Sequence, residues 1–497
     1  MGRKAHNPVL RARSFRADSY RVNRAALGTV VVAVLTALSF GRLAPEGGAA
    51  TTTLPKVSLS FPYDRPTTVK SKSDDVKAAW WSWKSAHITS NNTGPTGRFR
   101  VIGEPKDGST FSEGMGYGML FASLMDEQPL FDGLWRFTAD HLDSNGLMHW
   151  KIGAPHEYRG TGAATDGDED MAMGLVQACV KTRTGTWPAS ALDYCAIGTT
   201  LINNIYAYEI DRAGPLPKGA PADNRGGELL PGDSWDTTNK PTVNLSYFAP
   251  AYFRVFGAFT GRTTEWNSVV ARNYELLNQT QAIAGNCSKL IPNWNDYEGN
   301  VRQVDWQPQN SGWWSWDAAR VGVRIALDRA WSASPESIET SNEIGSFFAS
   351  VGIENVKAEY GLDGTAKNSY TSPFFISNAA APIWAATKLT PVKCGAANGS
   401  LLSSPQSAYD TNLAQMDRPE SYYSNAWRLM SMMLMSGNFP NLYAESIVVA
   451  QAGDPLAFST PVKVNGTPTP AKPKTSTPRN PRTKTKAKGK PGSVAHG

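Results

Sequence analysis

The sequence has few of the residues that mark a metal or nucleotide site. Its 497 residues contain six scattered histidines and four cysteines without a CxxC pair, so no zinc pattern is present. The glycine-rich run "GMGYG" at 114–118 matches neither GxxxxGK[ST] nor GxGxxG. The acidic run "DGDEDM" has Met171 where a calcium loop needs glycine and Gln177 where it needs its last acid. We therefore expect neither a metal nor a cofactor.

The body of the chain also lacks an excess of basic charge. The chain as a whole carries +6, but residues 1–24 contribute +6 and residues 463–490 contribute +9, which leaves −9 for residues 25–462. A nucleic-acid-binding body is expected to be basic. The acidic body therefore excludes nucleic acid as its partner, and the basic character belongs to the two ends.

Long hydrophobic runs are scarce, and the one at 25–40, "AALGTVVVAVLTALSF", has sixteen residues. A membrane-spanning helix needs about 20. The run follows a basic segment and precedes the small residues "GGAA" at 47–50, as in an export signal. We interpret residues 1–50 as a basic leader plus export signal and expect a secreted protein. The alternative is a protein anchored to the membrane through an uncleaved signal.

Export permits disulfides, and four cysteines allow three pairings. Cys179 and Cys195 are sixteen residues apart in neighbouring predicted helices. This spacing favours the bonds Cys179–Cys195 and Cys287–Cys394.

The segment 460–497 is rich in Pro, Thr and Lys and has almost nothing to bury, so we expect it to be disordered. Its charge suits contact with an anionic envelope surface, and a plain solvated tail is the alternative.

Between the two ends, residues 51–459 show twelve helix-like segments by period and start signals. They begin near Asp74, Ser112, Pro129, Asp168, Ala189, Leu245, Thr263, Asp317, Glu339, Ser372, Pro405 and Tyr422. The odd-numbered segments are mostly amphipathic, whereas the even-numbered ones are apolar nearly all round, as buried helices are. This alternation predicts an all-α fold, an (α/α)6 barrel of six helical hairpins.

The starts of the even-numbered segments are rich in acids and aromatics. In such a barrel the inner helices run parallel, so Glu113, Asp166 and Asp317 would meet at one end with Arg320 and the tyrosines of "SYYS" at 421–424. Gly114, Gly116 and Gly118 would let the inner helix that follows Glu113 approach its neighbours, and let a ligand approach its backbone. We expect the substrate cleft at this N-terminal end of the inner helices.

Facing carboxylates in a cleft with aromatic walls suit glycoside hydrolysis. A proton donor needs burial or a neighbouring negative charge, and a base needs partners that keep it ionised. Glu113 lies among apolar residues with Asp166 as the candidate neighbouring charge, and Asp317 has Arg320 one turn on. These residues predict Glu113 as general acid and Asp317 as general base.

The motifs "SEGMGYGML", "NGLMHWKI", "ATDGDEDMAMGL", "NLSYFAPAYFRVF", "WDAARVGVRIALD" and "YYSNAWRLM" resemble glycoside hydrolase family 8, in that family's order, over about 95–440. The resemblance implies an (α/α)6 barrel and an inverting mechanism on β-1,4-linked glycans. It also implies Glu113 as acid, Asp317 as base and Asp166 as a ligand of the sugar beside the cleaved bond. Candidate substrate-binding residues are Trp150, Tyr247, Trp235, Arg320, Trp316 and Tyr423.

The sequence therefore predicts a secreted, monomeric endo-acting hydrolase of β-1,4-glucan polysaccharide. The alternatives are a xylanase or chitosanase of the same family, or a catalytically inactive glycan-binding protein of the cell wall. Asp317 argues against the chitosanase branch, because that subfamily lacks an aspartate at this position.

Overall fold

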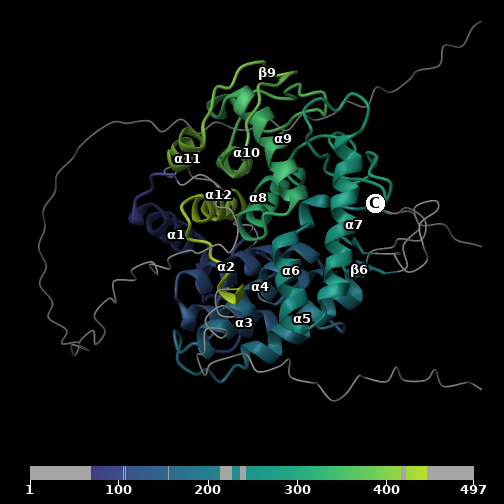
Figure 1. Cartoon of the computed structure of the whole chain (residues 1–497). Helices are drawn as coiled ribbons and strands as arrows, with labels where there is room; N and C mark the ends of the chain where they lie inside the picture. Colours follow the sequence, from purple (N-terminus) through teal and green to yellow (C-terminus); the bar gives the residue numbers. More distant parts are fainter. Residues whose placement is uncertain are drawn as a thin grey trace, which may run out of the picture. The chain divides into compact units, whose positions relative to one another are not determined.

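The computed structural model describes residues 69–103, 106, 108–154, 156–212, 227–234, 242–415 and 421–444. Within these ranges the chain forms twelve α-helices (Figure 1). They are α1 Ser73–His87, α2 Ser112–Leu124, α3 Gln128–Ala139, α4 Thr165–Arg183, α5 Tyr194–Tyr208, α6 Pro250–Thr260, α7 Thr263–Gln281, α8 Val321–Trp331, α9 Pro335–Val351, α10 Pro373–Ala385, α11 Pro405–Leu413 and α12 Tyr422–Met435.

The even-numbered helices form a closed inner ring. Each of them contacts the next one, from α2 through α4, α6, α8 and α10 to α12, and α12 contacts α2 again. The odd-numbered helices pack outside this ring, and α1 closes the outer layer against α12 (Figure 1). The predicted (α/α)6 barrel is therefore confirmed, with inner and outer helices alternating as the hydrophobic pattern indicates.

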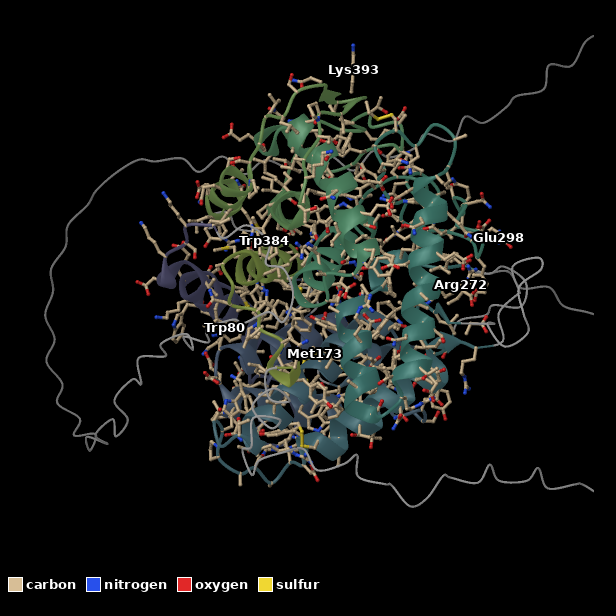
Figure 2. All side chains as sticks on the ribbon, in the orientation of Figure 1. Trp80, Met173, Arg272, Glu298, Trp384 and Lys393 are labelled. Carbon is tan, nitrogen blue, oxygen red and sulfur yellow. A yellow bond between two sulfur atoms is a disulfide. The ribbon has the colours of Figure 1, made fainter. Side chains whose placement is uncertain are left out.

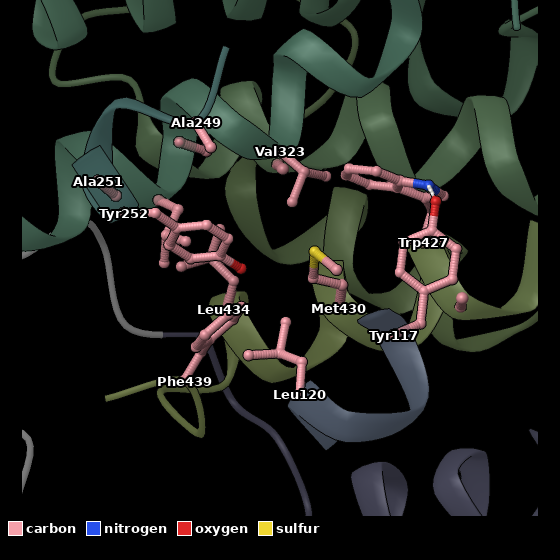
Figure 3. Close-up of a cluster of buried hydrophobic side chains, with 14 of the residues drawn as sticks. Tyr117, Leu120, Ala249, Ala251, Tyr252, Val323, Trp427, Met430, Leu434 and Phe439 are labelled. Atoms are coloured by element: carbon pink, nitrogen blue, oxygen red, sulfur yellow. Dashed lines mark hydrogen bonds between the residues drawn. The ribbon is translucent and has the colours of Figure 1, made fainter. Parts of the chain in front are cut away.

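The interior of the ring is filled by apolar side chains, as in other protein cores. Leu120 of α2, Val323 of α8 and Met430 of α12 are fully buried and meet there (Figure 3). Figure 2 shows Met173 of α4 well inside the body, whereas Lys393 and Glu298 project from the surface. Helices that are apolar on every side are stable here because every side is covered.

Glycines bring α2 and α4 unusually close. A Cβ atom added at Gly116 would lie 2.8 Å from the Gly167 carbonyl oxygen, and one added at Gly167 would lie 2.6 Å from the Ser112 carbonyl carbon. Neither position tolerates a side chain without moving a backbone. The expected access of ligand to the glycine backbone is wrong at Gly114, because a Cβ there would meet the ring of Tyr422 at 3.2 Å.

Four helices begin four or five residues from the predicted starts, and α4 begins at Thr165, three residues before the predicted Asp168. Helix α5 begins at Tyr194 and not near Ala189, because Asp193 caps it by accepting from the Ala196 amide. Helix α9 begins at Pro335 and not near Glu339, behind the cap Ser334.

The other two differences concern inner helices. The segment at Leu245–Tyr247 is a separate 3-10 turn, η2, and α6 starts only at Pro250, since a residue that precedes proline avoids the helical region. The turn η3 at Ala318–Arg320 likewise precedes α8. These two short turns place Tyr247 and Arg320 at the mouth of the ring.

Short strands decorate the barrel. A three-stranded antiparallel sheet joins β3 Thr110–Phe111, β4 His149–Gly153 and β5 Glu157–Ala163. Two-stranded pairs join β1 Ile88–Thr89 to β2 Arg100–Val101, β6 Ile210–Asp211 to β7 Glu228–Leu229, and β8 Lys393–Cys394 to β9 Ala397–Asn398. One further 3-10 turn, η4, spans Ile353–Asn355. The sheet β3–β4–β5 matters most, because β3 runs directly into α2 and Glu113.

Both predicted disulfides are confirmed. Cys179 in α4 is bonded to Cys195 in α5, and Cys287 is bonded to Cys394 across 107 residues. Among the helices of the described ranges, none combines the length and apolar character needed to cross a membrane. The predicted leader at 1–50 and tail at 460–497 lie outside the described residues.

Candidate active site

Three predicted carboxylates meet around one guanidinium. Arg320 of η3 donates to Asp166 through Nη1 (2.5 Å) and to Asp317 through Nη2 (3.0 Å), and its Nη1 lies 3.8 Å from Glu113 Oε2. Their helices put them there, because Glu113 and Asp166 are the second residues of α2 and α4 and Asp317 precedes η3. The convergence predicted from the starts of the inner helices is thus observed.

Glu113 has the surroundings of a proton donor. Burial raises its pKa to about 7, with a further increase from the negative charge of Asp166, whereas Arg320 and a hydrogen bond from Tyr422 oppose the rise. The Tyr422 hydroxyl donates to Glu113 Oε1. The Glu113 side chain still keeps 23% of its surface accessible. Near neutral pH the group can therefore hold a proton and present it to a bound molecule.

Asp317 has the surroundings of a proton acceptor. Each carboxylate oxygen faces one donor: Oδ1 accepts from Arg320, and Oδ2 accepts from Gln307 Nε2 at 2.8 Å. An ionised carboxylate accepts hydrogen bonds only, so two donors match this form. The side chain remains 18% accessible, and it can therefore reach a water molecule or a ligand.

Asp166 supplies charge behind Glu113. Burial raises its pKa, and the charge and hydrogen bond of Arg320 oppose this. Of the other acids in "DGDED", Asp168 accepts from the Met148 amide at 3.1 Å, and Asp170 forms a buried two-bond pair with Arg324 at 2.8 and 3.0 Å. Only the first aspartate of this run thus belongs to the mouth, whereas Asp168 and Asp170 form hydrogen bonds in the layer beneath it.

Aromatic side chains line the same end. The Tyr247 ring centroid lies 4.9 Å from the Arg320 guanidinium carbon and that of Tyr423 lies 5.8 Å from it. The Tyr423 hydroxyl donates to the Trp316 carbonyl at 2.7 Å, and the Trp316 ring stacks on Phe374 with centroids 5.2 Å apart. Tyr247, Tyr423 and Trp316 therefore lie at the same end of the ring as the carboxylates.

Trp150 lies farther out, on β4, with 40% of its surface exposed. Its ring stacks on Phe111 (6.1 Å between centroids), and Phe111 stacks on Tyr422 (6.0 Å, planes 5° apart). A row of aromatic rings thus leads from Trp150 to the hydrogen-bond partner of Glu113. The remaining candidate, Trp235, lies outside the described residues.

Three residues of the site carry no role in the sequence-based prediction. Tyr422 heads an inner helix, so its position at the mouth is predictable, but its bond to Glu113 is not. Tyr117 lies one turn after Glu113 and its hydroxyl is 3.5 Å from the carboxylate. Gln307 comes from an irregular loop with no periodic pattern, and no sequence signal identifies it.

Comparison with known proteins agrees with this arrangement. The family model for glycosyl hydrolases family 8 matches residues 66–437. Endoglucanase A of Acetivibrio thermocellus is 31% identical over 83% of this chain and 80% of its own length, and Endoglucanase 2 of Ruminiclostridium josui is 33% identical over 75% and 73%.

Among solved structures, the β-1,3-1,4-glucanase of Paenibacillus sp. X4 superposes with a TM-score of 0.64 at 26% identity, over 76% of this chain and 96% of that one. Rex8A of Paenibacillus barcinonensis, solved with xylose, shares the fold with a TM-score of 0.57 at 19% identity, over 74% and 94%. The family match spans the barrel together with all three carboxylates, and the chain belongs to glycosyl hydrolase family 8.

Proposed function

We propose that this protein is a secreted endo-β-1,4-glucanase that hydrolyses cellulose-like glucans with inversion at the anomeric carbon. The observation that carries the proposal is the pairing of unlike carboxylates around Arg320. Glu113 has a pKa of about 7, set first by burial, and Asp317 receives a donor on each oxygen. A glycosidase needs one carboxylic acid and one carboxylate held in different surroundings.

In this mechanism Glu113 donates its proton to the glycosidic oxygen as the bond to the anomeric carbon breaks. Asp317 accepts a proton from a water molecule, whose oxygen attacks the same carbon from the opposite face. Asp166, held by Arg320 at 2.5 Å, supports the proton on Glu113 through its negative charge and offers its free lone pairs to hydroxyls of the sugar.

Inversion is supported by the resemblance to glycoside hydrolase family 8. Inverting enzymes separate the two carboxylates by about 6.5–9.5 Å to admit water, and retaining enzymes by about 5–5.5 Å. Arg320 contacts both groups, with Nη1 3.8 Å from Glu113 and Nη2 3.0 Å from Asp317.

Glucan as the substrate is supported by the relatives. Endoglucanases A, 2 and C are 31–33% identical to this chain, and two further endoglucanases are 25% and 28% identical. The two reducing-end xylose-releasing exo-oligoxylanases are 25–26% identical. Xylan and chitosan remain the alternative substrates. A cell-wall protein that only binds glycan is disfavoured because both the acid and the base are present.

Two measurements test the proposal. Release of reducing sugar from carboxymethyl cellulose, mixed-linkage glucan, xylan and chitosan should be highest on the first two. Proton NMR of fresh product should show the α-anomer first. A preference for xylan or chitosan would change the substrate, and the β-anomer first would contradict inversion.

Secretion is supported by the two disulfides, since such bonds persist in oxidising compartments. We propose that the leader at 1–50 directs export and that the mature chain begins near residue 51. Mass spectrometry of the protein from culture medium tests this. Recovery of the intact leader in the membrane fraction would favour the anchored alternative.

A further inference from the structure

The carboxylate of Asp317 is held by a residue of the preceding loop as well as by Arg320 of the following turn η3. Gln307 lies in the irregular segment 302–316, and its Nε2 donates to Asp317 Oδ2 at 2.8 Å. Arg320 Nη2 donates to the other oxygen, Oδ1, at 3.0 Å. Two donors on two oxygens fix the rotation of the carboxylate about its own bond, which one donor alone does not do.

The orientation of the Gln307 amide is itself determined. Trp294 Nε1 donates to Gln307 Oε1 at 2.7 Å. An indole N–H can only donate, so the amide oxygen must face Trp294 and the amide nitrogen must face Asp317. Trp294 is 5% exposed, and its ring packs edge-to-face against Trp306 with centroids 5.3 Å apart.

Asn293, the neighbour of Trp294 in the chain, holds the backbone next to Asp317. Asn293 is fully buried, and its Oδ1 accepts from the Ala318 amide at 2.9 Å. Its Nδ2 donates to the Asn310 carbonyl at 3.2 Å and lies 3.4 Å from Gln307 Oε1. Residues 293 and 294 therefore hold Asp317 at two points, one through the backbone and one through Gln307.

We propose that Gln307 is a positioning residue that aims the Asp317 carboxylate at the attacking water. This inference rests on the proposed acid–base function. Gln307 itself exchanges no proton. Its amide selects one rotation of the carboxylate, and Trp294 selects one orientation of the amide. A small misplacement of a reacting group can lower a rate by about 10²-fold, so the contribution belongs to turnover and not to substrate binding.

The first test compares three variants of the loop. Gln307→Leu removes the donor at similar size and should lower kcat roughly 10- to 100-fold, with KM within about twofold. Trp294→Phe removes only the N–H that orients the amide, and should lower kcat less. In the double variant the two losses should not add, because both act on one hydrogen bond. Gln303→Leu, an exposed position in the same loop, should leave kcat unchanged.

The second test gives a signature that a merely structural residue would not produce. In Gln307→Glu the introduced carboxylate cannot donate to Asp317, but its protonated form can, through its O–H. Relative to the wild type, kcat of Gln307→Glu should therefore recover as the pH falls from about 8 to about 5, toward the ordinary range of a glutamate. Gln307→Leu should show no such recovery.

Two results would overturn the inference. One is a Gln307→Leu enzyme with unchanged kcat while Asp317→Asn is inactive. The other is a lower melting temperature together with a lower kcat in both Gln307 variants, without recovery of kcat at low pH in Gln307→Glu. That result would make the residue structural. An active Asp317→Asn enzyme would instead refute the proposed function, so the two failures are distinguishable.

Discussion

The two halves of the site hold their carboxylates in different ways. The proposed acid, Glu113, lies on the first turn of α2, with Tyr117 one turn further along and Tyr422 on the first turn of α12. The proposed base, Asp317, ends a loop, and one of its two donors, Gln307, comes from that loop. On the acid side, burial and nearby charge set the affinity for a proton. On the base side, hydrogen bonds fix the orientation of the carboxylate. The barrel thus sets the proton affinity of Glu113, and the loop sets the orientation of Asp317.

The largest effects should come from removing either carboxylate. We expect Glu113→Gln and Asp317→Asn each to lower kcat by about 10²–10⁴-fold, the usual contribution of general acid–base catalysis, with circular dichroism unchanged. The control is Asp140→Asn, which alters a surface carboxylate paired with Arg98. Near wild-type turnover in either site variant would remove that residue from the mechanism.

The next largest effect should come from Arg320, the link between the two halves. Arg320→Lys keeps the charge but loses the planar fork that reaches Asp166 and Asp317 at once. We expect kcat to fall roughly 10- to 100-fold because both carboxylates lose their orientation. The measurement is steady-state kinetics on a soluble glucan.

A matched control for this substitution is Arg98→Lys, since Arg98 forms a two-bond pair with Asp140 at the surface. It should leave kcat unchanged. If Arg320→Lys were as active as the wild type, the positive charge alone would be sufficient at this position. The hydrogen bond from Arg320 would then not be needed to orient Asp317.

A smaller effect should appear in the pH dependence of kcat/KM, which reports on the acid side of the site. As the proposed acid, Glu113 must be protonated to act, so kcat/KM should fall as the pH rises through about 7, the pKa to which burial and the charge of Asp166 raise it. In Tyr422→Phe the hydrogen bond that lowers this pKa is lost. The pKa should then rise, and the alkaline limb of the profile should move to higher pH.

Tyr423→Phe is the control for that shift, because the Tyr423 hydroxyl donates to the Trp316 carbonyl and not to Glu113. Its alkaline limb should stay in place. A limb that does not move in Tyr422→Phe would mean that Glu113 is not the group whose titration limits activity.

The predictability of the molecule follows the same division. The twelve helices and the convergence of Glu113, Asp166 and Asp317 are predictable because a buried inner helix must be apolar on all sides, so its polar first turn stands out. The exact starts of α5 and α9 were missed, since a single capping residue, Asp193 or Ser334, decides them.

The loop residues could not be predicted for a physical reason. Gln307 reaches Asp317 from a segment that Trp294 and Asn293 hold by hydrogen bonds to the Gln307 amide and to the Asn310 carbonyl. Such contacts depend on the folded path of an irregular chain, and they leave no periodic trace in the sequence. The orientation of the Asp317 carboxylate is therefore evident only from the structure.

The smallest expected effect concerns the outer end of the acid half, at Trp150. Its ring is 40% exposed and stacks on Phe111, which stacks on Tyr422. A flat exposed ring in line with the acid suits stacking on a sugar face, a contact that we expect to resemble other aromatic stacking at about 0.5–1.5 kcal/mol. Trp150→Ala should therefore raise KM for long oligosaccharides roughly two- to tenfold, with little change in melting temperature.

Trp81→Ala is the matched control, because Trp81 is a 59% exposed tryptophan on the outer helix α1, and it should leave KM unchanged. The comparison of thermal midpoint with KM decides the role of Trp150, since truncation of a buried tryptophan costs about 3–5 kcal/mol of stability. A large fall in midpoint with unchanged KM would make Trp150 a structural support for Phe111 and Tyr422. The aromatic row would then serve only to hold the partner of Glu113, and the acid half would end at Phe111.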